Sequence, residues 1–162
     1  MAKKSKAKTK VKSVPSNVAV VKSLAVVLAD SYVLALKTHG FHWNVEGPLF
    51  PQLHELFGKQ YEALVDAADE VAERLRALDV VAPASFAQYV RLSNINEETT
   101  APSAQGMVAQ LLADYEILAG DIRKGIDAAD DADDEDSEDL LTSQLHDAHK
   151  TAWMLRAMLR GK

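Results

Sequence analysis

The sequence contains no cysteine, which excludes thiolate metal ligands, disulfide bonds and zinc sites of the cysteine type. This absence also fits a reducing compartment. No uninterrupted apolar run approaches the roughly 18 residues that a membrane-spanning helix needs. The first apolar stretch is interrupted by Lys22 and Asp30, so the core of a signal peptide is missing as well. We therefore expect a cytoplasmic protein without a membrane partner.

Two structural patterns are also absent. No segment alternates apolar and polar residues as an exposed strand does, and no internal repeat is visible. The Glu-x-x-His pairs that build a metal site inside one four-helix bundle are missing, because no histidine has a glutamate three residues before it. The 162 residues, 48% of them apolar, suit one helical domain with a sizeable core.

Apolar residues recur at spacings of three and four over four long stretches, which predicts four long helices. Two helical hairpins joined by a long crossover predict an all-α four-helix bundle, which we place at residues 16–162. We expect the helices at about residues 17–44, 51–78, from 103 towards an acidic run, and 138–159, with a short crossover helix near 86–90.

Charge is distributed unevenly along the chain. The net charge is −6, yet the first twelve residues hold six lysines and no acid, whereas the remainder holds all 24 acids and 12 bases. Such a segment cannot bury enough apolar surface to fold, so we expect residues 1–15 to be disordered. This tail is either a solubilising segment or an arm that binds DNA without sequence preference. Its lysines are Lys3, Lys4, Lys6, Lys8, Lys10 and Lys12.

Two histidines and two acids are the candidate metal ligands. His42 and His54 flank the segment NVEGPLFP, which predicts a turn where the imidazoles can meet. Asp69 and Glu73 project from one face of the second helix, four residues apart. Asp69 lies roughly 22 Å along that helix from His54, so one chain cannot bring the four together. A second copy, antiparallel about a two-fold axis, would complete two identical sites.

The second helix carries a half-apolar stripe on which this axis would lie. The stripe suits a subunit contact, with the axis near residues 61–65. The alternative is a partly solvated face with ordinary ion pairs, of which Glu70 with Arg74 is one candidate. The stripe comprises His54, Gly58, Tyr61, Val65, Asp69 and Glu73.

The segments KTHGFHWNVEGPLFPQLHELFGKQY, DEVAERLRALD and DLLTSQLHDAHKTAWMLR resemble the Dps family, the DNA-binding proteins from starved cells. The resemblance implies a ferritin-like bundle, a hollow dodecamer, and ferroxidase centres shared by two subunits. It implies that His42, His54, Asp69 and Glu73 bind ferrous iron, which hydrogen peroxide oxidises for storage as ferric mineral. Imidazole and carboxylate ligands also suit Zn²⁺ or Mn²⁺.

One position departs from the family pattern. Gly58 stands one turn after His54, where the family often has an acid that supports the second iron. Two neighbours of the histidines have open roles. Trp43 either packs or intercepts an oxidising equivalent, and His39 is a candidate outer ligand or hydrogen-bond partner.

Residues 127–139 hold nine acids in thirteen positions, which is usually a solvated loop. In a hollow cage, clustered acids can instead focus cations into a pore. The resemblance implies acidic three-fold pores in this region, and the candidates are Asp134, Asp136 and Asp139.

The leading hypothesis is an iron-storing ferroxidase in a nucleoid-associated homo-oligomer that protects DNA. The alternative is a structural DNA-condensing cage with a weak or vestigial metal site, as Gly58 hints. A third interpretation keeps the cage and omits DNA.

Overall fold

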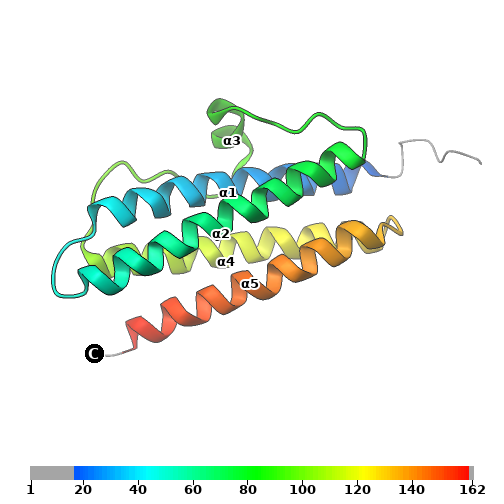
Figure 1. Ribbon diagram of the computed structural model, residues 1–162. Coiled ribbons are helices and arrows are strands. Elements are labelled where there is room, and N and C mark those ends of the chain that lie inside the picture. The colour runs from blue at the N-terminus through cyan, green and yellow to red at the C-terminus, as the bar shows by residue number, and fades with distance from the viewer. Residues whose placement is uncertain (1–16, 161–162) are drawn as a thin grey trace, which may run out of the picture.

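The computed structural model describes residues 17–160, within which all regular structure is helical. Four long helices form two antiparallel hairpins, α1 with α2 and α4 with α5, which pack together mainly through α1 and α4 (Figure 1). The short helix α3 lies in the crossover and contacts α1. The all-α bundle with a helix-bearing crossover is thereby confirmed. The helices are α1 (Val18–Asn44), α2 (Phe50–Ala77), α3 (Phe86–Leu92), α4 (Ala104–Asp130) and α5 (Glu135–Leu159).

The buried stripe of α2 shows how helical periodicity builds the core. The residues of this stripe are all buried and lie four or seven residues apart, which is one or two helical turns: Leu53, Phe57, Leu64, Val71 and Leu75. Each such side chain contributes about 1.5–3 kcal/mol through removal from water. The stripe that carries the candidate ligands lies on another face of α2, which the subunit leaves largely uncovered.

Helix α1 is apolar and long enough to cross a membrane by length and composition alone. In its most apolar window, 56% of the residues are buried inside the bundle. That burial is the pattern expected of the core helix of a bundle rather than of a lipid-facing helix.

The acidic run is more helical than a solvated loop, and the expected start of the last helix at residue 138 is wrong. Helix α4 continues to Asp130 and α5 begins at Glu135, with Asp133 between them in the left-handed region at φ 53°. The carboxylate of Asp134 accepts a hydrogen bond from the backbone N–H of Ser137 and caps α5. Acids in the first turn favour helix formation because they face the positive end of the helix dipole.

The ion pair expected between Glu70 and Arg74 is not formed, so that prediction is also wrong. Its guanidinium reaches across the bundle to α5, where it donates to Asp134, Asp136 and the Ser137 hydroxyl. Burial tends to raise the pKa of Asp134, but the hydrogen bonds from Ser137 and the charge of Arg74 outweigh it and lower that pKa. This network fixes the end of α2 beyond Glu73 against the start of α5.

A buried carboxyl fastens the crossover to the bundle. Asp30 on α1 is fully buried and accepts hydrogen bonds from the Ser93 hydroxyl and the Asn94 backbone N–H, both 2.7 Å. The other oxygen of Asp30 accepts no hydrogen bond, and the carboxyl lies beside the carboxylate of Asp121. Burial, reinforced by Asp121, raises the pKa of Asp30 to about 6. A proton on Asp30 therefore bridges the two carboxyls.

Asp30→Asn should remove a pH dependence of stability. The folded chain holds the Asp30 proton up to about pH 6, whereas the unfolded chain loses it near pH 4. The stability that this proton provides is therefore complete below about pH 4 and falls as the pH rises to 6. We expect the asparagine variant to match wild type at pH 4 and to exceed it by about 2 kcal/mol at pH 8. Urea unfolding at both pH values measures this, with the exposed Asp127→Asn as control. A variant destabilised equally at both values would contradict the shared proton.

Candidate metal centre

The turn between α1 and α2 places the two candidate histidines side by side. Val45 is buried at the end of α1, and Gly47 adopts φ 96°, a conformation that residues with side chains rarely take. The backbone N–H of Phe50 then donates to the carbonyl of Gly47 at 3.0 Å, and Pro51 fits the first turn of α2. The last turn of α1 consequently faces the first turns of α2.

His42 and His54 are held together by two reciprocal hydrogen bonds, each from a ring nitrogen to the other residue's backbone carbonyl. Nδ1 of His42 donates to the carbonyl oxygen of His54 at 2.7 Å, and Nδ1 of His54 donates to the carbonyl oxygen of His42 at 2.8 Å. The two rings stack with centroids 3.7 Å apart. A carbonyl can only accept, so both protons reside on Nδ1. In the neutral form, each ring therefore keeps the Nε2 lone pair free for a metal ion.

Gly58 makes room for this arrangement. A Cβ atom built at this position would lie 3.3 Å from Nδ1 of His42 and 3.4 Å from Cε1. A side chain here would therefore crowd the His42 ring, which would have to shift by a few tenths of an ångström. On the other side of the pair, Phe50 stacks on His54 with ring centroids 5.1 Å apart.

An aromatic cluster adjoins the histidine pair. The His39 ring stacks on Tyr61 with ring centroids 3.8 Å apart. It also contacts the Trp43 ring, with centroids 4.0 Å apart. Tyr61 meets the His42 ring edge-on, with centroids 5.7 Å apart. The sequence places Tyr61 on the ligand stripe near the expected two-fold axis, but its contact with the histidines was not predicted. Trp43 is 61% exposed and is therefore not a core residue of the single subunit.

Asp69 and Glu73 lie on the same helix as His54, exposed and several turns away. Within residues 17–160, no group of three or more histidine, aspartate, glutamate or cysteine side chains is close enough to hold a metal ion. The subunit thus brings the two imidazoles together and keeps both carboxylates apart from them. Three of the four candidate side chains, His54, Asp69 and Glu73, lie on the ligand stripe of α2, and His42 of α1 adjoins its first turns.

The remaining candidate residues lie elsewhere. The lysines of the N-terminal tail fall outside the described residues. Asp136 and Asp139 are exposed on the first turns of α5, as the pore prediction requires of them. Asp134 is engaged with Arg74 and Ser137, and its side chain is 8% exposed.

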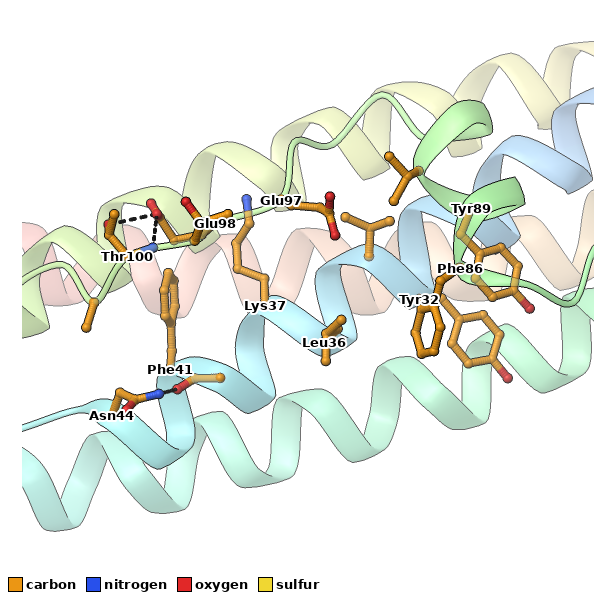
Figure 2. A pocket seen from close by; sticks show the side chains of 15 residues that line it. Tyr32, Leu36, Lys37, Phe41, Asn44, Phe86, Tyr89, Glu97, Glu98 and Thr100 are labelled. Atoms are coloured by element: carbon orange, nitrogen blue, oxygen red, sulfur yellow. Dashed lines mark hydrogen bonds between the residues drawn. The ribbon is translucent and has the colours of Figure 1, made fainter.

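A cavity of about 350 Å³ between α1 and the crossover is separate from the histidines. Figure 2 shows the stacked rings of Tyr32 and Tyr89 near one end and Glu98 with Thr100 towards the other. Hydrogen bonds from Gln110 and Thr100 lower the pKa of Glu98 to about 2. The carboxylate is therefore already satisfied within the subunit, and the cavity offers no imidazole ligand.

Comparisons with known proteins identify the fold and its family. The Ferritin-like domain family matches residues 21–161. A crystal structure of Dps from Staphylococcus aureus is 31% identical, with a TM-score of 0.86 over 88% of this chain and 96% of that one. The DNA protection during starvation protein 2 of Bacillus anthracis is 39% identical over 88% of this chain and 98% of its own length. The chain belongs to the Dps family. This family serves iron storage and DNA protection in general.

A further Dps structure places the family in a wider group. Dps from Vibrio cholerae is 26% identical, has a TM-score of 0.89 over 98% of this chain, and is described as a member of a superfamily of ferritin-like diiron-carboxylate proteins. The likeness extends over the whole described bundle, the crossover included. The resemblance drawn from the sequence is therefore confirmed at the level of family and fold.

Replacing Gly58 and Gly40 by alanine should give different results, because only the first adjoins a histidine. A Cβ atom at Gly40 meets nothing within 4 Å, so alanine there should raise the unfolding free energy by about 1 kcal/mol through helix propensity. Gly58→Ala gains the same propensity but crowds the His42 ring, so its gain should be about 0.5 kcal/mol smaller or lost. Thermal or urea unfolding measures both variants. An equal gain in the two would mean that the His42 ring yields without cost.

Proposed function

We propose that this Dps protein oxidises ferrous iron with hydrogen peroxide at centres shared between two subunits. The observation that carries the proposal is the His42 and His54 pair, which presents two imidazole Nε2 atoms at the start of α2, whereas the carboxylates of Asp69 and Glu73 lie out of reach near the other end. Asp69 and Glu73 of a second copy, running antiparallel, would complete the ligand set. Two identical centres would then form at each two-fold contact.

The chemistry of the donor set supports iron as the substrate. Two neutral imidazoles and two carboxylates with open positions bind ferrous iron well, and also accept Zn²⁺ or Mn²⁺. The backbone carbonyls that hold both Nδ1 protons fix the orientation of the rings and increase the basicity of Nε2. Oxidation by peroxide would remove ferrous iron and peroxide together, and storage would follow as ferric mineral.

The assembly we propose is the hollow dodecamer of the family. Val65, 40% exposed, and Tyr61 lie midway between the half-sites, where a two-fold axis would pass. Burial of this half-apolar stripe against its copy provides a driving force for the dimer.

Acidic residues at the start of α5 would supply iron to the interior. Asp136 and Asp139 offer exposed carboxylates that can line a pore and focus cations. Asp134 would contribute to the field of the pore while it remains bound to Arg74.

The lysine-rich tail would tether the cage to DNA in the cytoplasm, at the nucleoid. An acidic body repels phosphate, so the six tail lysines are the cationic element best suited to the contact. Several tails on one cage would bind one DNA molecule together and raise the avidity well above that of a single tail.

Mixing two inactive variants should restore ferroxidase activity if the centre is shared. One variant carries His42→Ala with His54→Ala, and the other carries Asp69→Ala with Glu73→Ala. In a mixed dimer, one of the two centres regains all four ligands. Random reassembly should therefore recover about a quarter of wild-type activity, since half the dimers are mixed. Single-turnover oxidation of ferrous iron by stoichiometric peroxide measures the recovery.

The control pair is Asp66→Ala and Glu70→Ala, two exposed acids of α2 that lie off the ligand stripe. Each should keep wild-type activity alone and in mixtures. Inactive variants whose mixtures stay inactive would argue against a shared centre. Wild-type oxidation no faster than that of the histidine variant would favour the alternative, a DNA-condensing cage with a vestigial metal site.

Deleting residues 2–12 should abolish DNA binding and leave iron oxidation unchanged. The deletion removes six positive charges, each of which contributes about 0.9 to the dependence of log binding constant on log salt. Gel-shift titrations of a duplex at low and moderate salt compare the deletion with wild type and with a tail in which the lysines become arginines. An unchanged shift at low salt would remove the tail from the proposal and leave a cage without DNA.

A further inference from the structure

Tyr61 is the aromatic residue that contacts the histidine pair from the ligand stripe itself. It lies one turn beyond Gly58 on α2, half-buried. Its ring stacks on His39 at an interplanar angle of 20° and meets His42 edge-on at 68°. The phenol is thus held in ring contact with an imidazole that we assign to iron.

Reduction of peroxide at this centre needs more electrons than one ferrous ion supplies. Hydrogen peroxide takes up two electrons when its O–O bond breaks, and one ferrous ion supplies one. Gly58 gives α2 no carboxylate beside the histidines, and the His42 ring packs against its Cα, where a Cβ atom would lie 3.3 Å from Nδ1. The helix therefore provides no ligand at this position for a second iron. A centre loaded with one iron needs a second one-electron donor.

We propose that Tyr61 is this donor, an inference that rests on the proposed ferroxidase function. One ferrous ion, one Tyr61 phenol, one peroxide and one proton would give one ferric ion, one phenoxyl radical and two waters. The phenol gives up an electron and a proton, and solvent supplies the other proton that the two waters need. The phenol oxygen lies 3.4 Å from Oε1 of Glu62, which accepts the phenol proton and passes it on.

The other three tyrosines of the chain are less suited to this step. Tyr115 is buried in the core, and burial raises its pKa well above the usual range, so its phenol resists loss of a proton. Tyr32 and Tyr89 stack on each other at the crossover, with centroids 4.7 Å apart. Burial also raises the pKa of Tyr89.

Trp43 is the other oxidisable side chain near the pair, but it contacts the centre less directly. Its ring contacts His39 at a tilt of 41°, with centroids 4.0 Å apart, whereas Tyr61 stacks on the same imidazole. His39 is thus a positioning residue that holds Tyr61 on one side and Trp43 on the other. The geometry places the phenol, and not the indole, in ring contact with His42.

The test uses the full-length assembly, loaded without oxygen with less than one ferrous ion per centre and then mixed with limiting peroxide. Freeze-quenched electron paramagnetic resonance detects radicals, and ferrous iron consumed per peroxide gives the stoichiometry. Wild type should consume about one ferrous ion per peroxide and show a tyrosyl radical. Tyr61→Phe keeps the ring stack and should lose the radical, consume about two ferrous ions per peroxide because peroxide takes up two electrons, and react more slowly than wild type.

The matched control is Tyr89→Phe, which removes a stacked phenol away from the centre and should behave as wild type. In the wild-type chain, deuterated tyrosine should narrow the radical signal, which identifies the radical as tyrosyl without any substitution. Gel filtration and Co²⁺ binding verify that Tyr61→Phe assembles with an intact histidine pair.

Three outcomes would overturn the assignment in distinguishable ways. Wild type that consumes two ferrous ions per peroxide without a radical would remove Tyr61 and leave the ferroxidase function intact. A tryptophan radical that persists in Tyr61→Phe would transfer the role to Trp43. Wild type that oxidises no iron with peroxide would overturn the proposed function and this inference together.

Discussion

The unbroken course of α2 is the constraint on which the rest of this structure depends. The helix runs from Phe50 to Ala77 and carries three of the four candidate ligands, His54 near its start and Asp69 and Glu73 near its end. Because an α-helix is rigid over this length, no rearrangement of side chains can close the gap of roughly 22 Å within one subunit. The buried stripe of the helix is committed to the core, so the ligands must share the stripe that remains uncovered. The spacing of the proposed ligands therefore requires a second subunit.

Much of the fold could be predicted because the apolar spacing of each long helix is regular. The bounds of α1 and α2 were expected within a residue or so, since Pro51, Gly47 and the buried stripe mark them clearly. The start of α5 was missed because the composition of the acidic run suggests solvated loop, whereas Asp134 caps the helix and its neighbours favour the dipole. Glu70 was predicted as the partner of Arg74 because it lies four residues away on the same helix. The guanidinium instead binds the start of α5, which offers it several hydrogen bonds at once.

Less of the candidate centre could be read from the sequence. The spacing of His42 and His54 indicates that they meet, but the reciprocal bonds to each other's carbonyls depend on the path of the turn and on the side-chain rotamers. The fit of the His42 ring over Gly58 has the same origin. The burial of Asp30 and its contact with Asp121 could not be predicted, because a single acid in an apolar helix indicates neither.

The proposed division of the ligand set between two subunits has a thermodynamic consequence. A metal ion that binds only where two subunits meet adds its binding free energy to their association, so iron and assembly are linked quantities. The linkage works in both directions: dilution that separates subunits weakens metal affinity, and rising ferrous iron drives subunits together. On that proposal, a newly made, unpaired chain would hold only the imidazole half of the centre and would bind weakly the ion that reacts with peroxide.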